Sequence, residues 1–316
     1  MRAATSRFAV TTAVLLLAMT GPAPAQLDPL GAEFQVNTFT PGYQADADVA
    51  ADAQGNFVTV WDGPATVSVA RTVFVQRFDR NGGALGTEYE VPTGMCAPPR
   101  FAPAMCRNST GGGALAWSTQ GIAGLEGKVF AQLFDSAGNL LGTEFQVSSQ
   151  PSSDSYEGDV SVACGDAGDF VVVWDSYGYD AFGITGRRFD SSGAPEGTEF
   201  QVNTYTSGYF FQPKVAADDD RDFVIVWNAG YAVDGSSTGI FGQRFASNGD
   251  FLGTEFQVNS YTMGSQRYGS VASNGAGDFV VAWDSSFSQD GSSDGIFGQR
   301  FASNGSFLGT EFQVNS

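Results

Sequence analysis

The sequence contains no histidine, and it has only three cysteines and fifteen lysine and arginine residues in 316 positions. Without an imidazole, the chain cannot use Ser-His-Asp or Cys-His catalysis, His-ligated zinc, or histidine as a general acid or base. Carboxylates remain, and glycoside chemistry needs a specific pair of them at a pocket. A carboxylate-dependent, glycan-active enzyme is therefore the enzymatic alternative that this composition leaves.

Basic residues are outnumbered by 34 aspartates and glutamates, which gives a formal net charge of −19. A surface of this sign repels polyanions, so the sequence disfavours nucleic acid as a partner. It suits cations, or neutral ligands such as sugars. An acidic surface also keeps a Gly- and Phe-rich protein in solution, which is the plainer interpretation.

Long apolar runs are absent except at residues 8–19, which follow Arg2 and Arg7 and precede the small residues Ala23 and Ala25. This layout is typical of a cleavable secretory signal, so we expect residues 1–25 to be removed. The run is too short to span a bilayer. We therefore expect a secreted or cell-surface protein, extracellular or periplasmic, without membrane insertion.

Three cysteines are too few for a disulfide scaffold, and a chain of this length buries a large core without one. Cys96 and Cys106 flank a loop found only in one part of the chain, and we predict that they pair with each other. Cys164 then remains as a buried, inert thiol. A bridge between Cys106 and Cys164 is the alternative.

What fills the chain is a repeated unit of 55 or 56 residues. Six marks of the type Gly-Thr-Glu-Phe-Gln-Val-Asn set its register, and they begin at Gly31, Gly86, Gly142, Gly197, Gly253 and Gly309. Between successive marks lie an apolar run that ends in Trp and a segment of the type Gly-Ile-Phe-Gly-Gln-Arg-Phe. A fixed period built from short β-type runs is typical of a radial or stacked β array.

The fourth repeat shows how each unit divides into strands. Residues 214–217, 223–227, 239–245 and 255–259 have strand patterns, and Asp-, Asn- and Gly-rich turns separate them. The second run is apolar throughout, as in a strand that is covered on both faces. Four antiparallel strands per unit predict an all-β protein in which residues 26–316 form a single β-propeller of five four-stranded blades.

The sequence contains six marks but only five strands that end in Trp. If each mark is an outer strand, there is one outer strand more than five blades need. The connection from each mark to the next strand is long enough to cross from the outer edge of one blade to the inner strand of the next, so the marks are outer strands. Residues 33–37 and 311–315 then compete for the outer position of the fifth blade. The strand that loses either stays free along the same blade or exchanges with a neighbouring molecule, which would produce a homo-oligomer.

The segments Gly-Asp-Phe-Val-Val-Val-Trp, Gly-Ile-Phe-Gly-Gln-Arg-Phe and Gly-Thr-Glu-Phe-Gln-Val-Asn together resemble a tandem repeat of large secreted or surface bacterial proteins. They resemble more loosely the integrin-α type of propeller. The resemblance covers nearly the whole chain after residue 25 and implies a propeller architecture. The integrin-type calcium loop, Asp-x-Asp-x-x-x-Asp, is only approximated here, so the resemblance implies hardly any chemistry.

Two sets of aromatic residues are candidates for ligand binding. One Trp ends the second strand of each repeat, and these indoles either pack between blades or form a ring of stacking platforms for sugar; they are Trp61, Trp117, Trp174, Trp227 and Trp283. The long loops, which we assign to the connections after the first and third strands, mix aromatics with carboxylates, as neutral-glycan or calcium-assisted binding surfaces do. The tyrosines that we select from these loops are Tyr205, Tyr209, Tyr231 and Tyr261.

A calcium site is predicted in the fifth repeat. Asp284, Asp290 and Asp294 lie on a Gly/Ser-rich loop that is flexible enough for a large, hard cation. The fourth repeat has Asn228 and Thr238 in two of the three equivalent places, so a site there would be weaker. Ca²⁺ is the cofactor that we expect, and a solvated turn is the alternative.

The glutamates of the marks recur in every unit, which favours a structural role for them. A single catalytic site would need residues that only one copy has. We therefore favour a non-catalytic propeller that acts as an extracellular binding or interaction module for a glycan or a surface protein, with glycan as the favoured ligand class. The alternatives are a structural protein that assembles by strand exchange and the carboxylate-dependent enzyme.

Overall fold

The computed structural model describes residues 31–65, 71–92, 100–119, 127–149, 156–177, 182–230, 233, 235–286, 289–291 and 293–315. Throughout these ranges the ordered elements are β-strands and turns. None of the described segments is a helix that is long and apolar enough to cross a membrane. The predicted signal segment, Cys96 and Tyr231 lie outside the described residues.

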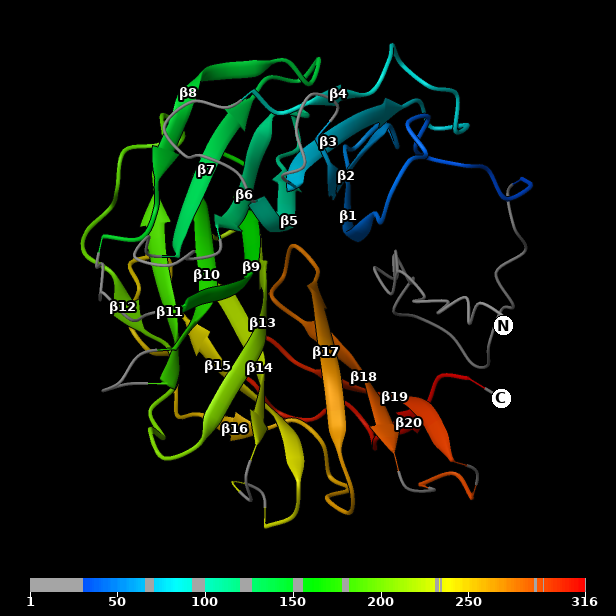
Figure 1. The fold of residues 1–316 in the computed structure, drawn as a ribbon. Coiled ribbons are helices and arrows are strands. Elements are labelled where there is room, and N and C mark those ends of the chain that lie inside the picture. Colours follow the sequence, from blue (N-terminus) through cyan, green and yellow to red (C-terminus); the bar gives the residue numbers. More distant parts are fainter. Residues whose placement is uncertain are drawn as a thin grey trace.

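The strands of the described residues form five four-stranded antiparallel sheets in chain order, which confirms the predicted blades (Figure 1). The innermost strands are β1 (Ala45–Ala51), β5 (Arg100–Arg107), β9 (Tyr156–Cys164), β13 (Tyr209–Ala217) and β17 (Gln266–Ser273). The second strands are β2 (Phe57–Pro64), β6 (Gly113–Thr119), β10 (Phe170–Tyr177), β14 (Phe223–Gly230) and β18 (Phe279–Ser286).

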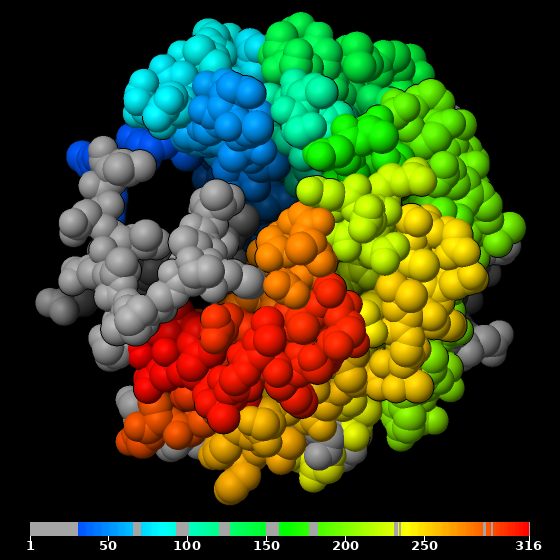
Figure 2. Space-filling view, turned by 180° about the vertical axis from the view of Figure 1, so that it is seen from behind, coloured from blue at the N-terminus to red at the C-terminus, as the bar shows by residue number. Residues whose placement is uncertain are grey.

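The third strands are β3 (Arg71–Phe78), β7 (Lys128–Phe134), β11 (Phe182–Phe189), β15 (Thr238–Phe245) and β19 (Asp294–Phe301). The outer strands are β4 (Tyr89–Glu90), β8 (Leu140–Gln146), β12 (Phe200–Gln201), β16 (Phe256–Gln257) and β20 (Phe312–Gln313). We number the blades one to five from β1–β4 to β17–β20. Successive innermost strands contact each other from β1 to β17, and Figure 2 shows the blades following one another around the axis in chain order.

Tight turns close each blade after its first and third strands. In the first blade, the Asp52 carboxylate accepts hydrogen bonds from the N–H groups of Gln54 and Asn56 at 2.9 Å, and Gly55 supplies the left-handed residue. The long connections therefore follow the second and fourth strands, and the assignment of the long loops to the first and third strands is wrong. The long loops share one end of the propeller, and the tight turns share the other.

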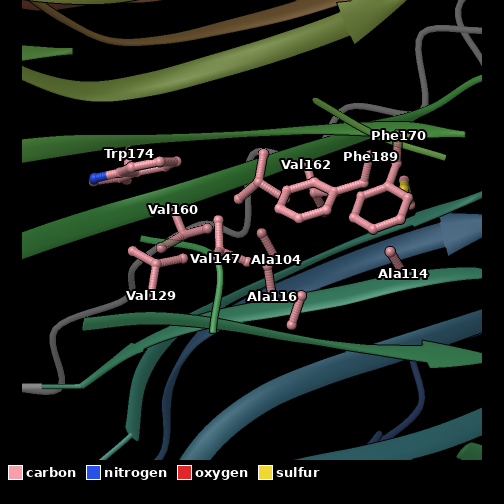
Figure 3. Close-up of a cluster of buried hydrophobic side chains, with 13 residues drawn as sticks. Ala104, Ala114, Ala116, Val129, Val147, Val160, Val162, Phe170, Trp174 and Phe189 are labelled. Atoms are coloured by element: carbon pink, nitrogen blue, oxygen red, sulfur yellow. The ribbon is translucent and has the colours of Figure 1, made fainter. Parts of the chain in front are cut away.

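Apolar side chains from several strands of each of two facing blades form a core between successive blades. Figure 3 shows the core between the second and third blades, with Trp174 at one end and the rings of Phe170 and Phe189 side by side at the other. The two phenyl rings are stacked, with centroids 5.0 Å apart. Comparable cores join the first and second, third and fourth, and fourth and fifth blades.

In the second, third and fourth blades the Phe of the outer strand extends this packing to the next blade. Phe256 of β16 contacts Phe279 and Phe301 of the fifth blade, with ring centroids 6.2 and 5.5 Å away. Phe145 and Phe200 make the same pair of contacts at the two preceding junctions. The repeated Phe is therefore a structural link between blades.

The recurring Glu holds the loop that enters its own blade. Glu88 accepts hydrogen bonds from the backbone N–H groups of Thr38 and Phe39, both at 2.6 Å. Glu255 and Glu311 bind the corresponding loops of the fourth and fifth blades. These carboxylates thus join the first and last parts of each repeat, as their recurrence predicts.

The two competing outer strands lie in different places. Residues 311–315 hold the outer position of the fifth blade, because Phe312 and Gln313 of β20 pair with β19. Residues 33–37 form no strand, and Phe34 instead packs on Phe57 and Phe78 of the first blade, 6.4 and 5.3 Å between centroids. Phe34 thus occupies the place that a preceding blade's outer-strand Phe would take.

The fifth blade consequently ends the series. Within the described residues, β17 does not pack against β1 as the other innermost strands pack against one another. Val258 of the fourth blade is 1% exposed because the fifth blade covers it, whereas its counterpart Val314 is 51% exposed. The outward face of the fifth blade is the sheet face that lacks a following blade.

The predicted pairing of Cys96 with Cys106 is wrong, because Cys106 forms a disulfide with Cys164. Cys106 lies near the end of β5, so an extended strand, which rises about 3.3 Å per residue, separates it from the loop that precedes β5. The neighbouring innermost strand β9 ends beside it and presents Cys164. The bridge links the second and third blades.

Candidate functional site

The five tryptophans lie inside the molecule, where all of their side chains are buried. Trp227 belongs to the core between the third and fourth blades, and Trp283 to the next core. Trp61 stacks on Phe74 of its own blade, with ring centroids 5.8 Å apart. The indoles offer no exposed face to a ligand, so a packing role replaces the interpretation of them as stacking platforms.

The innermost strands change direction near the long-loop end. Each of them shifts register against its second strand, as at a β-bulge. In four of the strands a residue other than glycine adopts a positive φ there: Asp46, Ala102, Gln212 and Tyr268. Bulges re-aim side chains and raise the local twist. Here they present a chemically different side chain from each blade beside the axis.

Two of the predicted tyrosines are exposed where the chain enters the fourth blade. Tyr205 lies in the connection before β13 and is 48% exposed, and Tyr209 is the first residue of β13 and is 43% exposed. Asn203 anchors this loop by donating a hydrogen bond to the carbonyl of Tyr205 at 2.8 Å, and Glu255 accepts one from Thr204 N at 2.7 Å. The backbone at Thr204 and Tyr205 is therefore held by two side chains.

Tyr261 occupies the same loop position in the fifth blade, where Asn259 donates to its carbonyl at 2.9 Å, but its side chain is half-buried. Tyr268 of β17 is an exposed ring that the selection from sequence did not include. Tyr205 and Tyr209 thus lie in and at the end of one connection, Tyr261 lies in the equivalent loop of the fifth blade, and Tyr231 is outside the described residues.

A second group, made of two aromatic rings and an arginine, joins the first two blades at the long-loop end. The Arg71 guanidinium lies 5.3 Å from the ring centre of Tyr43 and 5.5 Å from that of Phe101. The same guanidinium forms an ion pair with Asp62, which is fully buried. Burial raises the pKa of Asp62 to about 6, and the hydrogen bond from Arg71 opposes this shift. Sequence reasoning missed this group because its members come from two blades.

Charged side chains of the innermost strands also meet. Burial raises the pKa of Asp159 on β9; the charge of Lys214 on β13 lowers it, and the charge of Asp46 on β1 raises it further. Asp46 and Asp159 are carboxylates that three of the five repeats lack at this position. They are the kind of non-repeated pair that the enzymatic alternative requires.

The predicted calcium ligands lie on two strands and the loop between them. Burial, followed by the nearby charge of Asp294, raises the pKa of Asp284, while Arg267 lowers it. Asp290 accepts a hydrogen bond from Gln313 Nε2 at 2.9 Å. Among the described residues no three acidic side chains are arranged as a metal site. Calcium binding stays a prediction.

Comparisons with known proteins concern the fold. No protein-family model matches the chain, and no curated protein matches its sequence. A solved protein of unknown function from Dyadobacter fermentans is similar over 89% of this chain and 85% of its own, with 9% identity and a TM-score of 0.56.

Two further solved structures are similar to the chain. A subtype N10 neuraminidase-like protein of A/little yellow-shouldered bat/Guatemala/060/2010 has 11% identity and a TM-score of 0.50, over 88% of this chain and 84% of that one. A GH43 endo-arabinanase from Bacillus licheniformis has 13% identity and a TM-score of 0.46, over 85% and 98%. At these identities the likeness concerns architecture alone.

Proposed function

We propose that the protein is a secreted, non-catalytic β-propeller that binds a neutral glycan at its long-loop end. The observation that carries this proposal is the two exposed rings at the entry to the fourth blade: Tyr205, in a loop that Asn203 and Glu255 hold in place, and Tyr209, at the start of β13. Sugar faces stack on aromatic rings, and a ring whose support is already ordered loses little freedom on binding.

The electrostatics of this end support an uncharged ligand. The chain carries a net charge of −19, with 34 acidic residues against 15 basic ones. A polyanion would be repelled, whereas hydroxyl groups can donate hydrogen bonds to carboxylates. The signal-like residues 1–25 support an extracellular setting, in which such a ligand would be met.

A glycan array tests the proposal with residues 26–316, with and without calcium. We expect binding of neutral glycans that falls about tenfold or more when Tyr205→Ala and Tyr209→Ala are combined, because a stacked ring contributes about 0.5–1.5 kcal/mol beyond the area that it buries. Phe307→Ala is the matched control, since it removes an exposed ring at the tight-turn end. Equal binding by the double variant and the control would contradict the proposal.

Strand exchange is a second candidate function, favoured by the placement of Phe34 and Val314. Phe34 already sits on the first blade as an outer-strand residue does, and the face around Val314 has no following blade. Residues 33–37 of one molecule replacing residues 311–315 of another would join the two faces. Light scattering at several concentrations compares residues 26–316 with a variant that lacks 26–38. Equal masses at every concentration would rule out the exchange.

The enzymatic alternative is tested on the same ligands. If Asp46 and Asp159 act as an acid and a base, a bound oligosaccharide is cleaved, and Asp159→Asn abolishes the release of reducing ends without abolishing binding. Intact oligosaccharide after long incubation would support the non-catalytic proposal instead. Chromatography of the incubated ligand distinguishes the two outcomes.

A further inference from the structure

A shallow cavity of about 340 Å³, wide open to solvent, lies at the tight-turn end between the third and fourth blades. Its lining is polar, although the cores on either side are apolar; it consists of Arg188, Glu196, Arg221, Ser247 and Asn248. Its volume lies within the range of small-molecule sites. The cavity is at the opposite end from the tyrosine loops, so it is independent of the glycan site proposed above.

Two lining residues depart from the repeat. Glu196 stands where the other four units have a leucine, namely Leu85, Leu141, Leu252 and Leu308. Arg221 stands where they have a glycine, namely Gly55, Gly111, Gly168 and Gly277. Residues that only one copy has, converging on one cavity, are what a site built into a repeat array requires. Neither charge occurs at these positions in the other four units, and in this one the Glu196 carboxylate accepts a hydrogen bond from Arg188 Nη1 at 3.3 Å.

Arg221 is held in a conformation that favours glycine. Its φ is +68°, close to the +88° of Gly168 in the same turn of the third blade. A side chain at positive φ brings Cβ against the backbone, so arginine is strained where glycine is not. Arg221 nevertheless occupies this position and lines the cavity.

The guanidinium of Arg221 retains its hydrogen-bonding capacity. Its nearest carboxylate oxygen, Asp169 Oδ2, lies 3.6 Å away, which is too long for a hydrogen bond, and the side chain is 46% exposed. Arg188 differs, because it already donates to the carbonyls of Ser247 at 2.6 Å and of Glu196 at 3.1 Å. Arg221 therefore offers a planar fork of donors to a ligand in the cavity.

We propose that this cavity binds a sugar acid, with its carboxylate on Arg221 and its hydroxyl groups toward Glu196. The guanidinium fork matches a carboxylate in two parallel hydrogen bonds. The carboxylates of Glu196 and Asp169 beside it disfavour a dianion such as sulfate, and they accept hydrogen bonds from hydroxyl groups. A hydroxylated monoanion meets both conditions.

Thermal shift and titration calorimetry test this proposal on residues 26–316 with glucuronate, glucose and sulfate at equal ionic strength. We expect glucuronate to bind saturably and to raise Tm, and glucose and sulfate to do neither. Arg221→Gly and Glu196→Leu each restore the residue of the sister repeats, so both variants keep the fold. Each weakens glucuronate binding by about tenfold or more.

Arg80→Ala is the matched control, because it removes one positive charge from an exposed turn of the first blade. It leaves the affinity for glucuronate unchanged. A lower Tm for Arg221→Gly with an unaltered response to glucuronate would show that Arg221 only links the two blades, and would overturn the proposal. Equal binding of glucose or sulfate, or no saturable binding of glucuronate, would overturn it as well.

Discussion

The outer and inner parts of the fourth and fifth blades have diverged to very different extents. Residues 239–260 and 295–316, which supply the third and outer strands, are identical at 21 of 22 positions. Residues 209–217 and 265–273, which supply the innermost strands, are identical at only 2 of 9. The two blades thus share one framework and present different side chains beside the axis.

The contacts explain this difference. The outer part carries the Phe contacts, the Asn and Glu anchors and the tight turns that every junction needs, so a change there disturbs a repeated contact. The innermost strands carry the bulges and the exposed side chains, where a change alters a surface. Specialisation in this fold therefore concentrates at the inner strands and at a few turn positions such as Arg221.

Removal of the Cys106–Cys164 disulfide should have the largest effect, and it tests whether the innermost strands also contribute to stability. The bridge closes a separation of 58 residues, so replacing both cysteines with alanine should lower the free energy of unfolding by about 4 kcal/mol. Denaturant titration measures the change. Cys96→Ala is the control, with an expected change near zero; an equally large loss there would contradict the pairing.

The identical outer parts provide a matched pair. Val258→Ala should cost about 2 kcal/mol, because the side chain is fully buried against the fifth blade, whereas Val314→Ala should cost less than about 0.5 kcal/mol. Both values come from denaturant unfolding. Equal costs would show that the outward face of the fifth blade is covered in solution.

The buried carboxyl group of Asp62 should make the free energy of unfolding depend on pH. Its folded pKa of about 6 exceeds the ordinary value of 3.8, so its stabilising effect is complete below pH 3.8 and is lost as the pH rises through 6. Between pH 8 and pH 5 this group should add about 1.4 kcal/mol to the free energy of unfolding. Asp62→Asn removes the increment, and an unchanged pH dependence in that variant would assign the effect to other carboxylates.

We expect calcium to stabilise the fifth blade through its loop and to have a weaker effect on the fourth blade. Bound calcium would offset the repulsion between Asp284 and Asp294, and at a free concentration ten times the dissociation constant it would add about 1.4 kcal/mol or less. Thermal melts with calcium and with chelator measure the shift, and Asp294→Asn should abolish it. Melts that superimpose would end the prediction.

The fold followed from the sequence because the repeat multiplied each weak strand signal. Five copies of an apolar run that ends in Trp show that the run is buried on both faces, which a single copy does not. The Cys106–Cys164 disulfide was predicted only as the alternative, because it depends on β5 and β9 lying side by side, and closeness in sequence favoured Cys96 instead.

The candidate sites were predicted less completely. Tyr205 and Tyr209 followed from aromatic residues in a long loop, whereas the Arg71 group and the cavity at Arg221 depend on residues from neighbouring blades that no local pattern connects. A signal for the cavity was nevertheless present in the sequence. Glu196 and Arg221 are single departures from leucine and glycine in otherwise regular repeats.

The hydrogen bonds of the recurring glutamates also have a consequence for the evolution of a repeat protein by duplication. Because Glu255 accepts a hydrogen bond from Thr204, and Glu311 accepts one from Ser260, each anchor and its donor lie within one stretch of about one repeat length. A gene duplication that copies such a stretch carries both partners of the bond with it. The number of blades can therefore change by whole units without leaving an unpaired carboxylate, and the near-identity of residues 239–260 and 295–316 is the trace that a recent event of this kind leaves.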